Sequence, residues 1–175
     1  MKQTALKFGV AAGVINAVLM FALMSFWKED QNFQMGELLG YASMVLALSM
    51  VFFGVRYFRN EHNTGSITFG KAFAVGLGIV LVASLIYVVG WFVYSRLIDP
   101  GMMDQYFETG MQAIRESDID ESAKAEKLEE MERYRSMYQN PLIEAGMTFL
   151  EIFPVGLLAS LIAAVVYKKR PPEQK

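Results

Sequence analysis

Two acidic residues stand in the apolar stretch near the end of the sequence, and they are the first candidates for chemistry. Glu144 precedes Glu151 by seven residues, and Pro154 follows three residues later. On a helix, a spacing of seven places the two carboxylates on one face. Pro154 cannot donate a hydrogen bond to the carbonyl of Leu150, so a carboxylate and a free carbonyl would lie one turn apart. Such oxygen groups could bind a proton or a cation.

Arg96 and Asn16 are the other polar residues that could belong to such a site. Arg96 ends another apolar stretch, and its guanidinium could form an ion pair with Glu151 or with Glu144. A charge inside a bilayer costs on the order of 3 kcal/mol, so an acid there needs a partner or a function. For Glu151 we expect an ion pair with Arg96; the alternatives are a proton or cation pathway and contact with a partner protein. For Asn16 we expect a hydrogen bond between helices, with substrate contact as the alternative.

Four apolar stretches must position these residues, and each is long enough to cross a membrane. They cover residues 8–27, 38–58, 72–98 and 142–167. A helix rises about 1.5 Å per residue, so about 20 residues cross a hydrocarbon core of roughly 30 Å. Inside lipid the backbone must satisfy its own hydrogen bonds, which requires helices. Since 54% of the 175 residues are hydrophobic, the sequence predicts an all-α integral membrane four-helix bundle.

Basic residues gather on one side of the predicted spans. With four spans, the N-terminus, residues 56–71 and the C-terminal tail share that side. These segments carry nine Lys and Arg residues, against only Glu61 and Glu173. Lys and Arg residues that flank spans mark the cytoplasmic side. We therefore expect both termini in the cytoplasm and residues 99–141 on the opposite side.

Residues 99–141 form a hydrophilic insert between the third and fourth spans. The insert begins with Pro-Gly and ends with Asn-Pro, and two apolar patterns at helical spacing lie between these breakers. The patterns predict an extracytoplasmic helical hairpin whose second helix is capped by Ser117 or Asp118. We interpret its mixed acidic and basic face as a solvated surface, with docking of a cation or a basic partner as the alternative. Its methionines have the spacing of helix packing, which favours core filling over a copper site.

Small residues repeat on one face of every predicted span. Small side chains let helix backbones approach closely in lipid, where no hydrophobic force drives helices together. We therefore expect close helix packing at these positions. They are Gly9, Gly13 and Ala17 in the first span, Gly40, Ala47 and Gly54 in the second, Gly76, Ala83 and Gly90 in the third, and Gly156, Ser160 and Ala164 in the fourth.

The residue types that most catalysis needs are scarce. The chain has one histidine and no cysteine, which removes thiol nucleophiles and Cys-based metal sites. It has no HExxH motif and no phosphate-binding glycine loop. Basic patches typical of nucleic-acid binding are missing from a chain whose net charge is -2. We therefore expect no enzyme, cofactor, metal or nucleic-acid partner, and we interpret His62, in a predicted polar loop, as a solvated residue.

Three segments of the chain resemble a known protein family. GSITFGKAFAVG, YSRLIDPGMMDQY and TFLEIFPVGLLASLIAAVVYKK are similar to a family of small four-span proteins from Bacteroidetes-type bacteria, catalogued as domain of unknown function 4199. The resemblance covers nearly the whole chain and implies the inner membrane of a Gram-negative cell, but no activity, ligand or catalytic residue. We therefore expect a structural or accessory membrane protein, with the lipid bilayer and either another membrane protein or a second copy of the chain as partners. The alternative is a small proton- or cation-coupled transporter that uses Glu151.

Overall fold

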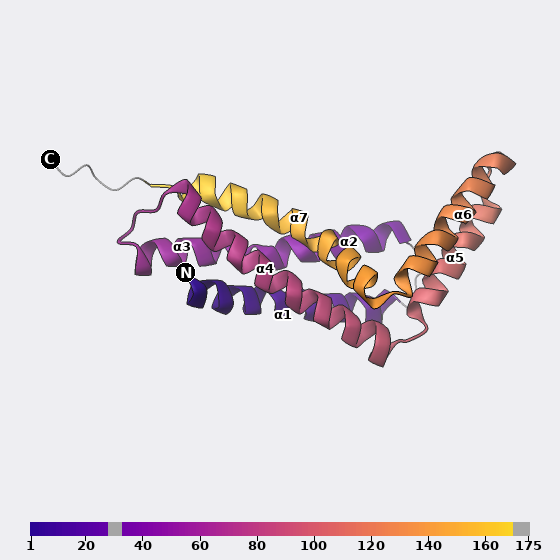
Figure 1. The fold of residues 1–175 in the computed structure, drawn as a ribbon, viewed down its shortest axis with the longest axis horizontal. Helices are drawn as coiled ribbons and strands as arrows, with labels where there is room; N and C mark the ends of the chain where they lie inside the picture. Colours follow the sequence, from indigo (N-terminus) through magenta and orange to yellow (C-terminus); the bar gives the residue numbers. More distant parts are fainter. Residues whose placement is uncertain (28–32, 170–175) are drawn as a thin grey trace. The chain divides into compact units, whose positions relative to one another are not determined.

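The computed structural model of this protein describes residues 1–27 and 33–169, and all regular structure within these ranges is helical. The helices are α1 (Lys2–Trp27), α2 (Phe33–Leu48), α3 (Met50–His62), α4 (Phe69–Val93), α5 (Met102–Glu116), α6 (Glu121–Tyr138) and α7 (Pro141–Tyr167), as Figure 1 shows. A short π-helical segment, Tyr94–Ile98, continues α4. Four stretches are long and apolar enough to cross a membrane: Lys2–Ser25, Leu38–His62, Phe69–Ile98 and Pro141–Tyr167. The predicted all-α class with four spans is therefore confirmed.

The chain divides into two compact units, and each is described by itself. Unit 1 consists of Met1–Gly90 and Phe149–Lys175, and unit 2 of Trp91–Thr148. Unit 1 thus contains α1, α2, α3 and most of α4 and α7. The end of α4, the start of α7 and the helices α5 and α6 belong to unit 2.

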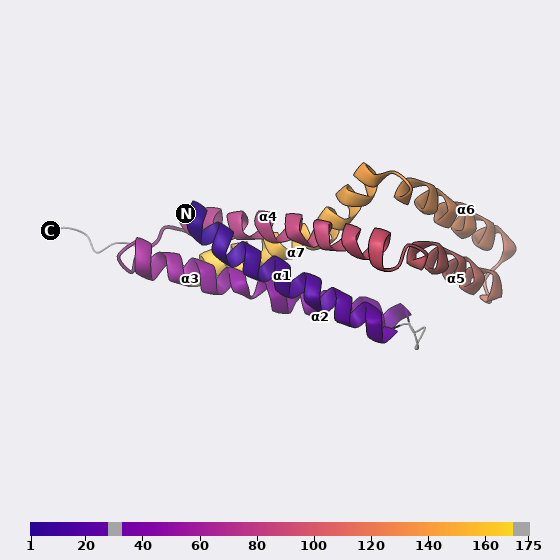
Figure 2. The same cartoon turned by 90° about the horizontal axis from the view of Figure 1, so that it is seen from below.

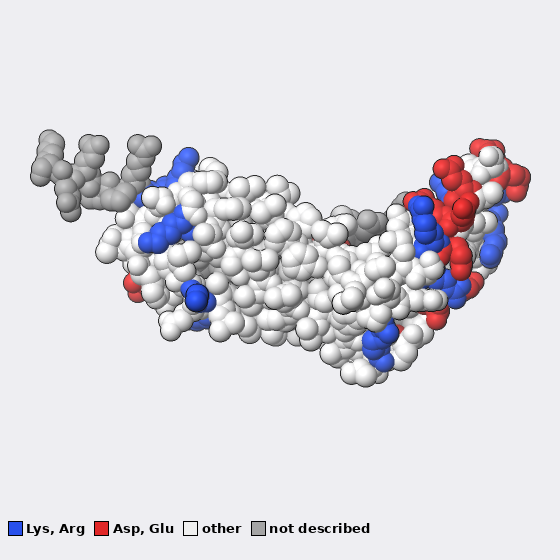
Figure 3. Space-filling view, in the orientation of Figure 1, with Lys and Arg blue, Asp and Glu red and all other residues white. Residues whose placement is uncertain are grey.

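The helices of unit 1 expose large apolar side chains. Val18, Val45, Leu85 and Leu158 are each 59–61% exposed, and Figure 3 shows an uncharged surface along these helices. In the most apolar part of α4 half of the residues are buried. The corresponding share in the other three spans is 28–33%, so α4 is the central helix. Exposed apolar surface on this scale marks an interaction site, and a bilayer would cover it.

Small residues bring α4 and α1 into close contact. A Cβ atom added at Gly9 would lie 2.6 Å from the nearest α4 side chain, and one added at Gly13 would lie 2.7 Å away. At Gly90 of α4 the added Cβ would lie 3.1 Å from Ala17. Ala83, on the same helix, is 1% exposed. Larger side chains at these positions would force the two backbones apart.

Helix α7 approaches α4 in the same way. A Cβ atom added at Gly76 would lie 3.0 Å from the Ser160 side chain, and Gly156 faces Val80 with no room for a Cβ atom. Ala164, one turn beyond Ser160, is fully buried. The small residues predicted for these spans therefore lie where the helices meet.

The second predicted span differs from its prediction in three respects. Gly54 packs against Ile79 and Ala47 is 1% exposed, but no atom of the described residues lies within 4 Å of a Cβ atom added at Gly40. The stretch is divided at Ser49 into α2 and α3. Its helix also continues to His62, through residues that the sequence assigned to a polar loop.

Backbone conformation, and not hydropathy, also sets the ends of other helices. Helix α7 begins at Pro141 and runs through Pro154. The loop before α4 contains Thr64 and Gly65 with φ values of 51° and 75°, a left-handed conformation that stops α3. Part of the predicted basic tail, residues 170–175, lies outside the described residues, as do residues 28–32.

Helices α5 and α6 of unit 2 lie side by side (Figure 2). The rings of Phe107 and Tyr138 are 5.8 Å apart between centroids. Arg135 of α6 donates to Glu108 at 2.7 Å and to Asp104 at 3.1 Å, both on α5. Hydrogen bonds to Asp104 and Glu108 raise the pKa of the Arg135 guanidinium, which therefore stays charged.

The start of α6 is capped by a different residue from the two predicted. The Asp120 carboxylate accepts from the backbone N–H of Ala123 at 3.0 Å, which is N-cap geometry. Ser117 instead donates to the carbonyl of Ile114 and belongs to the end of α5. Asp118 lies between the helices, two residues too early to reach the first free N–H groups of α6.

A candidate functional site around Glu144

The first turn of α7 places Glu144 at the centre of a polar site. Pro141 occupies the first helical position, where its missing N–H costs no hydrogen bond. Before it, the Asn140 side chain accepts from the backbone N–H of Leu142 at 3.0 Å, and the Asn140 carbonyl accepts from the N–H of Glu144 at 2.9 Å. The asparagine thus caps the helix, and Glu144 is held in its first turn.

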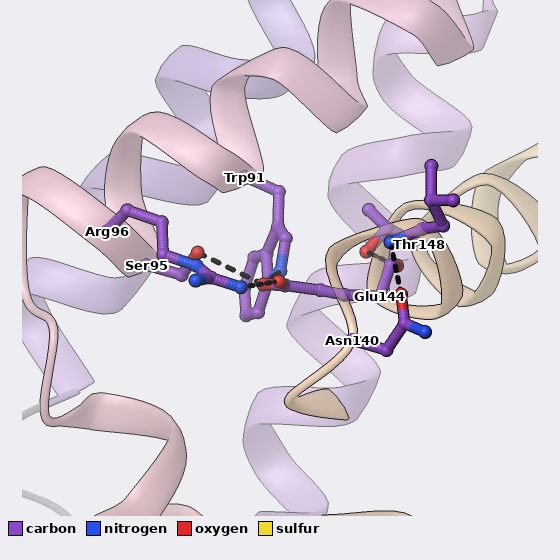
Figure 4. Close-up of polar contacts among 7 residues, drawn as sticks. Trp91, Ser95, Arg96, Asn140, Glu144 and Thr148 are labelled. Atoms are coloured by element: carbon purple, nitrogen blue, oxygen red, sulfur yellow. Dashed lines mark hydrogen bonds and ion pairs between the residues drawn. The ribbon is translucent and has the colours of Figure 1, made fainter. Parts of the chain in front are cut away.

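Three donors from the end of α4 and the π-helical segment surround the Glu144 carboxylate (Figure 4). Oε1 accepts from Trp91 Nε1 at 2.9 Å and from Ser95 Oγ at 3.2 Å. Oε2 accepts from Arg96 Nη2 at 2.6 Å, which is both a hydrogen bond and an ion pair. Both oxygens are therefore occupied by groups of the same chain.

The two charged members of this site differ in exposure. The Glu144 side chain is 3% exposed, whereas the Arg96 side chain is 49% exposed. The guanidinium carbon of Arg96 also lies 5.8 Å from the centroid of the Phe92 ring, within range of a cation–π contact. The arrangement buries a carboxylate and leaves its counter-charge half open to the surroundings.

The π-helical segment explains how neighbouring residues reach one carboxylate. The backbone N–H of Asp99 donates to the carbonyl of Tyr94 at 2.9 Å, five residues earlier, which gives a wider turn than an α-helix. Trp91 and Ser95 are four residues apart and share a face, and Arg96 reaches Oε2 through its long side chain. Single π-helical turns occur often at functional sites.

The structure brings together two of the residues that the sequence singled out, Arg96 and Glu144. Glu151 lies one turn beyond Thr148 and is exposed, whereas Glu144, Thr148 and Ile152 are buried. The two acids predicted to share a face therefore differ in burial. The ion pair observed for Arg96 is with Glu144, the second of the two acids considered. The pairing of Arg96 with Glu151 stays a prediction.

Asn16 lies buried inside unit 1. The residue is 1% exposed, and within the described part of the chain neither its side-chain oxygen nor its nitrogen has a hydrogen-bond partner. The hydrogen bond between helices that we expected for Asn16 is therefore not formed there. Near it on α1, a Cβ atom added at Gly13 would meet the Ile86 side chain and the Ala83 carbonyl of α4, and Ala17 lies against Gly90 of α4. Ser84 of α4 is fully buried, and its hydroxyl has no hydrogen-bond partner among the described residues either.

Sequence reasoning missed two members of the site, Trp91 and Ser95. The signal was present as an i, i+4 pair of donors followed directly by Arg96. A tryptophan at the end of an apolar stretch is also typical of the aromatic belt at a membrane boundary, so its residue type alone does not indicate a site. Within the described residues, no group of three or more His, Cys, Asp or Glu side chains could hold a metal ion.

One family model matches this chain. Its description is "Protein of unknown function (DUF4199)", and the match covers residues 7–169. No curated protein and no solved structure matches the chain. The matched range therefore includes every residue of the Glu144 site.

Proposed function

The chain belongs to the family of proteins of unknown function DUF4199, and from that premise we propose a structural or accessory protein of the bacterial inner membrane that acts through partners. The observation that carries the proposal is the closed site at Glu144. Both carboxylate oxygens accept hydrogen bonds from donors of the same chain. These bonds hold the end of α4 and the start of α7 together, which is a structural role. We assign no catalysis, cofactor or metal to the protein.

The proposal includes a multi-pass topology. Both termini lie in the cytoplasm, and residues 99–141 lie in the periplasm. The support is the distribution of basic residues, since the segments that share a side with the termini are rich in Lys and Arg. Four helices long and apolar enough to cross a membrane are compatible with this arrangement.

Helix α6 is the part of the chain that we expect to contact partners. It has 18 residues, and none of them is buried. Its surface carries Glu residues interspersed with Lys and Arg residues, as Figure 3 shows for this helix. Another membrane protein and a second copy of the chain are the candidate partners, because a charged helix of this kind can form specific contacts without entering lipid.

Photocrosslinking in intact cells tests the proposal. A photoreactive amino acid replaces Glu126 or Glu130, both exposed on α6, or Leu85, which is 60% exposed on the apolar α4. We expect a discrete adduct from the α6 positions and only lipid adducts from Leu85. Two copies of the chain with tags of different size identify self-association. The absence of any discrete protein adduct along α6 would contradict action through partners.

A second candidate function is a small proton- or cation-coupled transporter that uses Glu151. It is favoured by the buried polar groups of Asn16 and Ser84, which lack partners within the described residues. Proteoliposomes with an imposed pH gradient decide between the two functions. The accessory role predicts the same flux as protein-free vesicles, whereas a transporter would show a flux that Glu151→Gln abolishes.

A further inference from the structure

One end of unit 1 gathers cations over aromatic rings. The helix ends that meet there are the start of α1, the end of α3, the start of α4 and the end of α7. We call this group the aromatic–cation cluster. Its members are Lys7, Phe8, Tyr57, Phe58, Arg59, His62, Lys71 and Tyr167.

A continuous row of contacts joins the two lysines of the cluster. Lys7 Nζ lies 5.1 Å from the centroid of the Tyr57 ring, and the His62 ring lies 5.5 Å from Tyr57. On its other side His62 is stacked on Phe58, with centroids 5.7 Å apart and planes 2° from parallel. Lys71 Nζ lies 5.7 Å from the Phe58 centroid. These distances lie within the range of about 6 Å for cation–π attraction.

The third cation of the cluster, Arg59, lies over the ring of Tyr167. The guanidinium carbon of Arg59 lies 5.3 Å from the centroid of Tyr167, the last residue of α7. Beside it, the loop before α4 is tied to the end of the chain, because Ile67 and Lys169 exchange two backbone hydrogen bonds of 2.9 Å. The contact of Arg59 with Tyr167 therefore joins the end of α3 to the end of α7.

These cations have no acidic partners in the part of the chain that the structure describes. Lys71 donates to the Asn63 amide oxygen at 2.6 Å, and Arg59 donates to Asn60 at 3.0 Å. An amide oxygen and an aromatic ring both attract a cation, but neither cancels its charge. Arg56, Lys168 and Lys169 are exposed nearby in sequence and add further positive charge. Figure 3 shows blue atoms and few red ones at this end.

We propose that the aromatic–cation cluster binds the phosphate groups of anionic phospholipids in the leaflet where this end of the helices lies. The inference rests on the membrane placement proposed above. Clusters of four to eight Lys and Arg residues next to a membrane span attract anionic lipids. Aromatic rings prefer the headgroup level, and the long stems of Lys and Arg let their charges reach it.

The arrangement of the rings favours lipid phosphate over nucleic acid. Single-stranded nucleic acids are held by bases stacked on open aromatic faces. Here Tyr57, Phe58 and Tyr167 already have a cation of the same chain over the ring. The rings therefore orient Lys7, Lys71 and Arg59 and do not serve as platforms for bases, whereas the positive charges, which no described acid neutralises, attract phosphate.

Spin-labelled lipids measure this preference directly in reconstituted vesicles. The full-length protein is placed in phosphatidylcholine vesicles with a trace of spin-labelled phosphatidylglycerol or spin-labelled phosphatidylcholine. The test variant is Lys7→Gln/Arg59→Gln/Lys71→Gln. The matched control, Lys124→Gln/Lys127→Gln/Arg133→Gln, removes the same charge from α6. All three proteins are first compared by circular dichroism and gel filtration to verify folding.

We expect phosphatidylglycerol to be enriched about threefold or more over phosphatidylcholine next to the wild-type chain and next to the control variant. The test variant should bring the ratio close to one, because each basic residue near the surface contributes on the order of a few-fold. A wild-type ratio of one, or a ratio that the test variant leaves unchanged, overturns the inference. Loss of the preference with 10 mM inorganic phosphate would assign the cluster to a free anion and overturn lipid as its ligand. The absence of any motionally restricted lipid would refute the membrane placement itself.

Discussion

Removal of Arg96 and removal of Glu144 should destabilise the protein to different extents. Arg96→Met leaves the Glu144 carboxylate, which is 3% exposed, with hydrogen bonds from Trp91 and Ser95 but no cation. Breaking a buried ion pair from one side typically costs about 3–5 kcal/mol, because the remaining charge is uncompensated. Because Trp91 and Ser95 still donate to the carboxylate, we expect Arg96→Met to lower the free energy of unfolding by about 3 kcal/mol, the low end of this range.

Glu144→Gln should cost less. The substitution leaves Arg96 without its counter-charge, but the Arg96 side chain is 49% exposed and can be solvated. What is lost is chiefly one charge-assisted hydrogen bond, worth about 1.5–3 kcal/mol. Because solvation of Arg96 offsets part of that loss, we expect a decrease of about 1.5 kcal/mol in the free energy of unfolding. The double variant should lose less than the two single variants added together.

Unfolding in mixed detergent micelles by titration with sodium dodecyl sulfate measures these free energies. Arg115→Met, which removes an exposed arginine from α5, is the control for loss of a positive charge and should change stability by less than about 0.5 kcal/mol. A cost of Glu144→Gln equal to or above that of Arg96→Met would refute the argument from exposure. A coupling energy below about 0.5 kcal/mol would show that the pair does not interact. The same cycle with Glu151→Gln tests the pairing of Arg96 with Glu151 that we predicted from the sequence.

Three further predictions concern the packing, the buried polar groups and the topology. Gly156→Ala should lower the free energy of unfolding by about 1–3 kcal/mol because its Cβ meets α4, whereas Gly40→Ala, with open space around it, should be neutral or slightly stabilising. Asn16→Leu should raise the free energy of unfolding by about 1 kcal/mol, since it removes an amide that is buried without partners; a decrease would show that the amide is bonded in the membrane. A cysteine at Ser122 should react with an impermeant thiol reagent in spheroplasts and one at Glu61 should not, and the reverse pattern would contradict the proposed topology.

The four spans could be predicted because length and hydropathy are properties of the sequence alone. The ends of the helices were less predictable, since a helix continues wherever its backbone hydrogen bonds do. Arg59, Glu61 and His62 are polar or charged, so the apolar stretch ends before them, yet α3 includes all three. Asp120 was missed as a cap for a related reason. The choice among Ser117, Asp118 and Asp120 depends on which residue begins the helical turn, and both serine and aspartate are good caps.

Close helix packing was predictable from small residues, but the face that each residue occupies was not fixed by its type. Gly54 and Gly40 belong to the same seven-residue repeat, and among the described residues only Gly54 meets a neighbouring side chain. The helix is divided at Ser49 between them. A repeat keeps one face only as long as the helix between its members stays regular. The sequence pattern did not reveal the division, because Ser49 is compatible with a helix interior.

The composition of the Glu144 site shows where prediction from a pattern ends. The charges of Arg96 and of two acids were evident, and hydropathy placed all three in or beside apolar stretches. The choice of Glu144 depends on two local features: the Asn140 cap that sets the first turn of α7, and the π-helical turn that carries Ser95 and Arg96. Neither feature has a hydropathy signal. An indole, a hydroxyl and a guanidinium of the same chain donate to this carboxylate, and these three hydrogen bonds compensate its burial. The exposed half of Arg96 is then the part of this site that stays accessible to another molecule.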